Sequence, residues 1–151
     1  MDRDELLAKS GNPPIRLEDH LQEVADYARQ VAQAYWPHWE NLLGPELASK
    51  VFQALVLAAL THDLGKIAEG FQLALRNKRH RWEFRHEVLS AAILLAGEFP
   101  DREVWELAVA AVLTHHRDLD DGSLGRNAGL LPLPIPEIVE EATRRFAARA
   151  Q

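Results

Sequence analysis

A helical spacing of apolar residues, recurring along most of the chain, is the feature that most constrains the fold. Residues 15–36 carry apolar side chains at alternating steps of four and three: Leu17, Leu21, Val24, Ala28, Val31 and Tyr35. This spacing predicts one helix, entered after Pro13 and Pro14. Residues 46–62 are apolar nearly all round, which predicts a second helix at the centre of a bundle.

Four further segments show the same helical signals. Gly65 is a plausible stop after the second helix, and residues 66–77 and 87–99 read as the third and fourth helices. Asp101 is a good N-cap for a fifth at 102–116, residues 117–136 read as a loop, and Pro136 opens a final helix at 136–150. No segment shows convincing strand alternation, so we expect an all-α, single-domain bundle of five to six helices over residues 1–151.

Composition narrows the class of protein. The 151 residues include no cysteine, which excludes disulfides and thiolate metal ligands and fits a cytoplasmic location. The charged N-terminus lacks the apolar core of a signal peptide, and we expect no membrane span. A formal charge of -6 argues against indiscriminate nucleic-acid binding but says little about a local patch.

Six potential metal ligands fall near the ends of the predicted helices: His20, His62, Asp63, His86, His115 and His116. Helix ends converge in a bundle, so ligands from several helices can meet in one cavity. Each histidine also has an ordinary interpretation: a core or capping residue, a solvated loop residue, or a response to the dipole at a helix C-terminus. Asp63 opposes that dipole, so a metal ion or Lys66 should compensate its charge.

Imidazoles with a carboxylate suit divalent first-row ions, and the lack of thiolates disfavours a structural zinc site. One carboxylate flanked by several histidines can bridge two ions, which would lower the pKa of a shared water and clamp a phosphate. The pattern leaves the identity of the ions open among Mn, Fe, Ni, Co and Mg.

The motif THDLGK at 61–66 resembles the signature of the HD superfamily of metal-dependent phosphohydrolases. The fuller series is DH at 19–20, FQ at 71–72, RHE at 85–87 and THH at 114–116, within a match from about residue 15 to 118. This series resembles the HD nuclease domain of the CRISPR-associated nuclease-helicases of type I interference systems. The resemblance implies an HD-type helical bundle, with the metal site between helix ends.

The resemblance also implies ligand sets and roles. His20, His62 and Asp63 would hold one ion, and Asp63 would bridge to a second ion held by His86, His115 and His116. Asp63 and Lys66 would be the catalytic residues, with Lys66 near the scissile phosphate. A salt bridge from Lys66 to Asp63, one turn away, is an equal alternative from spacing alone.

One departure concerns a further acidic ligand that the family supplies after the double histidine. No aspartate follows Asp121. The substitutes would be Asp118, Asp120, Asp121, Glu137, Glu140 or Glu141, or else the domain is truncated at its C-terminus and the ligand lies outside it.

A basic segment lies between the HD pair and His86. Its candidate nucleic-acid contacts are Arg76, Lys78, Arg79, Arg81, Trp82 and Arg85. Cations that follow phosphates and rings that stack on bases are typical of single-stranded grooves. The alternative is a solvated loop with Trp82 and Phe84 tucked into the core.

These observations lead to the expectation of a metal-dependent phosphodiesterase that cleaves single-stranded DNA with metal-activated water in CRISPR antiviral interference. No GxxxxGK[ST] loop occurs, so this chain is not expected to be an ATP-driven helicase itself. The resemblance implies that this motor is a second domain or a separate subunit. The expected partners are that helicase and the RNA-guided surveillance complex. The alternatives are an HD phosphohydrolase acting on a deoxynucleoside monophosphate or an alarmone, and a catalytically inactive docking module.

Overall fold

The chain folds as an all-α domain with one small hairpin. The structure, a computed structural model, describes residues 5–77, 79–97 and 99–116. The helices within these residues are α1 (Leu17–Leu43), α2 (Pro45–Thr61), α3 (Glu69–Arg76), α4 (His86–Ala96) and α5 (Arg102–Thr114), with a short 3-10 helix, η1 (Leu64–Ile67). The predicted all-α class is confirmed.

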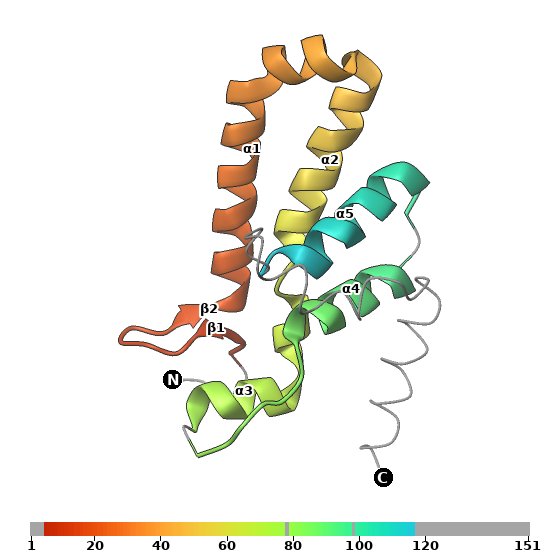
Figure 1. Cartoon of the computed structure of the whole chain (residues 1–151). Coiled ribbons are helices and arrows are strands. Elements are labelled where there is room, and N and C mark those ends of the chain that lie inside the picture. Colours follow the sequence, from red (N-terminus) through yellow and green to blue (C-terminus); the bar gives the residue numbers. More distant parts are fainter. Residues whose placement is uncertain (1–4, 78, 98, 117–151) are drawn as a thin grey trace, which may run out of the picture.

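Helix α2 is the central element. It runs antiparallel to α1, with which it forms a long hairpin, and α5 packs across its C-terminal half (Figure 1). The core lies where α2, α4 and α5 meet, and its buried members are Ala54, Ala58, Ala91, Leu94, Val104, Ala108, Val109 and Val112. This core holds the end of α2, the start of α4 and the end of α5 close together.

The buried face of α1 differs from the predicted one beyond its first two turns. Its buried residues are Leu17, Leu21, Ala25 and Ala32, whereas Val31 and Tyr35 are 48% and 57% exposed. The predicted apolar face of α1 contains the larger side chains. In the structure, Ala25 and Ala32 of α1 and Ala48 of α2 have no exposed surface. Small side chains allow two helices to pack closely, so here size decided which face is buried.

A two-stranded antiparallel hairpin, β1 (Leu7–Lys9) and β2 (Ile15–Arg16), precedes α1. This short hairpin was not predicted from the sequence, and it leaves the all-α class unchanged. Strands of three and two residues are too short to display the alternation by which a strand is predicted. The backbone N–H of Leu17 donates to the carbonyl of Leu6 at 2.9 Å, so the hairpin leads directly into the helix that carries His20.

Gly65 does not end a helix but lies inside η1, where this turn touches α4. A Cβ at Gly65 would lie 2.1 Å from the carbonyl oxygen of His86. The Gly65 N–H donates to Ser90 Oγ at 2.7 Å, and this hydroxyl donates to the His86 carbonyl at 2.9 Å. The segment after α2 is therefore joined to the start of α4 at backbone contact.

The predicted N-cap of α5 is confirmed. Asp101 caps α5, accepting from the N–H groups of Glu103 at 3.0 Å and Val104 at 3.2 Å. The loop expected at 117–136 and the helix expected at 136–150 lie outside the described residues.

One segment, Pro45–Ile67, is long and apolar enough to cross a membrane by length and composition alone. The expectation that no segment approaches such a span did not hold for this region. In the fold the segment is α2 with η1, packed against α1 and α5. Core helices of soluble proteins meet the same criterion.

Candidate metal centre

Asp63 is the middle of a cluster formed where four helix ends meet. It follows α2 directly, and its side chain is 2% exposed. His62 comes from the end of α2, His20 from the first turns of α1, His86 from the start of α4, and His115 and His116 from the end of α5. The six residues predicted as ligands thus come together, although four segments of the chain supply them.

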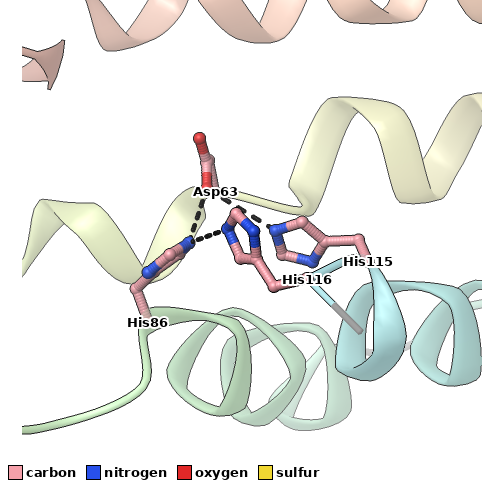
Figure 2. Close-up of side chains that lie close together, drawn as sticks. All are labelled: Asp63, His86, His115 and His116. Carbon is pink, nitrogen blue, oxygen red and sulfur yellow. Dashed lines mark hydrogen bonds and ion pairs between the residues drawn. The ribbon is translucent and has the colours of Figure 1, made fainter. Parts of the chain in front are cut away.

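One group of imidazoles faces the Oδ1 atom of Asp63. His86 Nε2 lies 3.0 Å from Oδ1, and His115 Nε2 lies 3.8 Å from it. His116 Nε2 lies 2.9 Å from His86 Nε2 (Figure 2). One potential ligand atom from each of these four residues falls within a region 4.8 Å across, a size that suits a single divalent ion.

A second group faces the other oxygen, Oδ2. His20 Nε2 lies 3.2 Å and His62 Nε2 lies 3.4 Å from this atom. These two histidines and Asp63 also place ligand atoms within 4.8 Å of one another. The two oxygens of one carboxylate thus face two separate sets of nitrogen ligands, the arrangement required of a bridging ligand.

Lys66 compensates the charge of Asp63. Its ammonium lies 2.6 Å from Oδ2 of Asp63 and donates to the carbonyl of Ala8 at 3.3 Å. Both side chains are buried. The salt bridge that spacing allowed is therefore present, and it ties the metal-site carboxylate to strand β1.

The electrostatics keep Asp63 ionised. Burial by itself would raise its pKa, but His115, His62, His86 and Lys66 together hold that pKa far below the usual range of a carboxyl group. Oδ1 is buried and accepts no hydrogen bond of good geometry from the described residues. An ionised, incompletely satisfied oxygen among imidazole nitrogens is a suitable cation ligand.

Two of the imidazoles are held in the tautomer that a metal requires. His62 Nδ1 lies 2.8 Å from the carbonyl of Ala59, and His115 Nδ1 lies 2.6 Å from that of Val112. A carbonyl can only accept, so Nδ1 carries a proton, and Nε2, on the side of Asp63, is the nitrogen that would bind a metal ion. The donor set therefore fits divalent metal ions.

A buried glutamine attaches the hairpin to the site. Gln72 Oε1 accepts from the N–H of Leu7 at 2.9 Å, and its Nε2 donates to the carbonyls of Leu7 at 2.9 Å and Lys66 at 2.7 Å. The neighbouring Phe71 ring lies edge-on to His86, with centroids 5.5 Å apart. The FQ pair entered the sequence analysis only through a resemblance, and no spacing rule indicated these contacts.

Glu87 and Ser90 are two buried polar residues for which no role was predicted. Glu87 adjoins His86 in the chain, and Ser90 accepts a hydrogen bond from the Gly65 N–H. Burial alone would raise the pKa of Glu87, but its own backbone N–H and Arg85 hold that pKa below the usual value. A carboxylate next to His86 in the RHE motif was the available signal.

The predicted nucleic-acid contacts occupy different environments. Arg76 donates to the carbonyl of Glu5, and Arg85 pairs with Glu87 at 2.6 Å. The half-buried Trp82 ring covers Gly70 and lies edge-on to Phe71 at 6.1 Å. Arg79 and Arg81 are exposed, and Lys78 lies outside the described residues. The contact of Trp82 favours the core interpretation for its ring.

The late acidic ligand cannot be placed. The proposed substitutes, Asp118, Asp120, Asp121, Glu137, Glu140 and Glu141, all lie outside the described residues. Within the described residues, the group of His20, His62 and Asp63 therefore has one ligand atom fewer than the group of Asp63, His86, His115 and His116.

Metal binding is expected to weaken as the pH falls from about 8 to about 6, because protons compete for the imidazole nitrogens. Burial lowers the pKa of His20 and of His116, so both are neutral near pH 7. Burial would also lower the pKa of His115, but Asp63 and the Val112 carbonyl raise it above its ordinary value. In the metal-free protein, His115 therefore keeps its proton until the pH rises through that raised pKa. A metal ion that binds below this pKa must displace the proton.

The measurement is the metal Kd at several pH values, with proton release counted by calorimetry in buffers of different ionisation heat. Below the raised pKa of His115 the Kd should increase by about tenfold per pH unit for each displaced proton. A Kd independent of pH over this range would contradict imidazole ligation.

Comparison with known proteins agrees with this arrangement. Two curated relatives match: a putative CRISPR-associated nuclease/helicase Cas3 of Myxococcus xanthus, 36% identical over 58% of this chain, and the CRISPR-associated nuclease/helicase Cas3 of Methanothermobacter thermautotrophicus, 31% identical over 69%. The chain spans only 13% and 12% of the length of these relatives. No solved structure matches significantly.

The HD domain family itself matches residues 17–144. That range begins at the start of α1 and contains all six clustered residues, with the adjacent His62 and Asp63 at their centre. On the extent of this match, and on the all-α fold that brings the histidines to one carboxylate, the chain belongs to the HD domain family.

Proposed function

We propose that this chain is a metal-dependent HD nuclease that cleaves single-stranded DNA in CRISPR interference. The observation that carries the proposal is the convergence of four histidines on the two oxygens of Asp63, with a fifth, His116, 2.9 Å from His86. The names of the two relatives, both CRISPR-associated nuclease/helicases, support a nuclease over a small-molecule phosphohydrolase.

The ligand sets follow the two groups around Asp63. His20, His62 and Asp63 would hold one ion, and Asp63, His86, His115 and His116 would hold a second. When bound, such ions lower the pKa of a water molecule and neutralise the charge of a phosphate. The ligands are compatible with Mn, Fe, Ni, Co or Mg, because geometry and availability decide among these metals.

Lys66 would have two roles at this site. In the metal-free protein it compensates the buried carboxylate of Asp63 at 2.6 Å. Once cations take over that compensation, its ammonium is free to stabilise charge that develops on the scissile phosphate. Its attachment to Ala8 O keeps it beside the site in either case.

The basic segment would guide the strand to the metal ions. Trp82 packs on Phe71, and Phe71 lies against the metal-site residue His86, so the segment borders the cluster. Exposed cations on an otherwise acidic protein attract a polyanion to one place. Arg79 and Arg81 have the exposed positions that phosphate contact requires.

The wider setting is also part of the proposal. Residues 1–151 would act as the nuclease domain, in the cytoplasm, together with a helicase on the same or another polypeptide. The helicase would supply single strands at a target marked by the RNA-guided surveillance complex. The presence of nuclease and helicase in each relative's name supports this pairing.

The test compares hydrolysis of single-stranded DNA, of a single-stranded RNA of the same sequence, and of a panel of deoxynucleoside monophosphates and alarmones, after loading with each candidate metal. DNA cleavage that requires metal is the expected result. Hydrolysis of nucleotides without DNA cleavage would instead identify a small-molecule phosphohydrolase. Failure to bind any metal would leave an inactive docking module.

Reversing the charge of Arg79 and Arg81 together is expected to weaken single-stranded DNA binding by at least about tenfold at low salt. Each lost phosphate contact should reduce the slope of log K against log salt by about 0.7. A matched control reverses Arg29 and Arg102, which pair with Asp26 and Glu106 on α1 and α5 away from the cluster. Equal effects of the two double variants would show that only net charge matters and would refute the guiding role.

A further inference from the structure

The histidines of the cluster differ in the group that contacts Nδ1, the ring nitrogen on the side away from Asp63. In His62 and His115 this nitrogen, Nδ1, lies against the carbonyl three residues earlier, at Ala59 and Val112. Both histidines end a helix, so the preceding turn offers that carbonyl. An outer acceptor of this kind fixes the tautomer of a metal-binding imidazole and raises its basicity.

His86 cannot use this arrangement because it opens helix α4 and no helical turn precedes it. Its Nε2 faces Asp63 Oδ1 at 3.0 Å and His116 Nε2 at 2.9 Å. Its Nδ1 instead faces a carboxylate oxygen, Oε2 of Glu87, at 3.7 Å. This separation is longer than a hydrogen bond, so in the metal-free protein the contact between the two groups is electrostatic.

Glu87 is an unusual residue to find buried at this position. Its side chain is almost fully enclosed, with a relative exposure of 4%. Oε1, the oxygen that does not face His86, accepts from Arg85 Nε at 2.6 Å. Its place in the first turn of α4 lets the helix dipole stabilise the negative charge. One oxygen is thus anchored, while the other is directed at the imidazole.

We propose that Glu87 is the positioning residue for His86, accepting a hydrogen bond from Nδ1 when metal is bound, so that Nε2 becomes the ligand atom that joins Asp63, His115 and His116. The inference rests on the proposed metal site but assigns a function to a residue outside the ligand set. It also gives a function to the pairing of Arg85 with Glu87, since the guanidinium orients the carboxylate that orients the imidazole.

The test is the change Glu87→Gln, which keeps the shape of the side chain but removes its charge. Titration of the metal-free protein with Mn²⁺ and with Co²⁺ is expected to show one site weakened by about 10- to 100-fold, the usual effect of losing an outer-shell partner, with the other site unchanged. The visible spectrum of bound Co²⁺ should change as well, because it reports on the ligand geometry of the ion.

Glu106→Gln is the matched control, since Glu106 also pairs with an arginine, Arg102 at 2.7 Å, but belongs to neither group of candidate ligands among the described residues. A second comparison repeats Glu87→Gln in a His86→Ala background. The loss in affinity should then largely disappear, because the residue through which Glu87 acts is absent. An equal loss in both backgrounds would show a merely structural role and overturn the proposal.

The remaining outcomes are also distinct. If the wild-type chain binds neither ion, the proposed function fails. If it binds both and Glu87→Gln binds them equally well, only the role of Glu87 fails. Should Glu87→Gln not fold, Glu87→Asp keeps the charge but is one methylene shorter, and unchanged metal affinity in that variant would overturn the inference.

Discussion

Replacing Asp63 by asparagine is expected to remove both metal ions and to lower hydrolysis by at least about 10³-fold. The carboxylate is the one group that faces both sets of imidazoles, through Oδ2 for His20 and His62 and through Oδ1 for His86 and His115. A neutral amide keeps the shape but cannot hold two cations. The several kcal/mol that bound metal contributes to phosphate hydrolysis would be lost with them.

A second consequence of the same change concerns the metal-free fold. Lys66 would be left buried without its partner at 2.6 Å. Breaking a buried ion pair from one side costs about 3–5 kcal/mol of unfolding free energy. The double variant Asp63→Asn with Lys66→Met removes both charges, so it should regain much of that stability while remaining unable to bind metal.

Denaturant unfolding of the metal-free proteins and metal analysis of the loaded ones separate these two effects. Full metal content in Asp63→Asn would refute the bridging role of this carboxylate. No difference in stability between the single and double variants would refute the pairing with Lys66.

Replacing Gly65 by alanine is expected to destabilise the protein by about 3 kcal/mol and to weaken metal binding at the same time. The new Cβ would lie 2.1 Å from the carbonyl oxygen of His86 and 2.9 Å from Leu89 Cβ. The His86 carbonyl is part of the backbone and cannot rotate away as a flexible side chain would, so η1 and α4 must separate. Overpacking of this kind lowers the free energy of unfolding by about this amount.

The expected loss of metal affinity in Gly65→Ala follows from the positions of Asp63 and His86. Asp63 lies two residues before Gly65, and the carbonyl that the methyl group would strike belongs to His86. Their facing atoms are only 3.0 Å apart, and metal sites tolerate deviations of about 0.2 Å in ligand distance. Gly97→Ala is the control, because its Cβ would meet nothing closer than Leu94 O at 3.4 Å. A Gly65→Ala protein with unchanged unfolding midpoint and metal Kd would show that the contact can relax.

Several elements were predictable because their signals are local. The apolar character of residues 46–62 predicted that α2 lies at the centre of the bundle. Asp101 indicated the start of α5, because an N-cap bonds only to N–H groups two and three residues further along the chain. The ligand types were equally local, since imidazole and carboxylate side chains next to helix ends narrow the chemistry to a few divalent metals.

Other features depended on which surfaces meet. The buried face of α1 follows Ala25 and Ala32, because the approach of α2 favours small residues over the larger Val31 and Tyr35. The hairpin β1–β2 has too few residues to show alternation, yet Gln72 and Lys66 hold it against the site from more than fifty positions away.

The all-α class, the central helix and the six candidate ligands could be predicted from the sequence, because periodicity, capping and ligand type are properties of neighbouring residues. That the five histidines gather around Asp63, that Lys66 is its ion partner, and that Gly65, Gln72 and Glu87 support the cluster became clear only from the packing of the helices. These contacts join residues far apart along the chain or depend on where a side chain points. Their distances are set by how α2, α4 and α5 pack, and no local pattern records that packing.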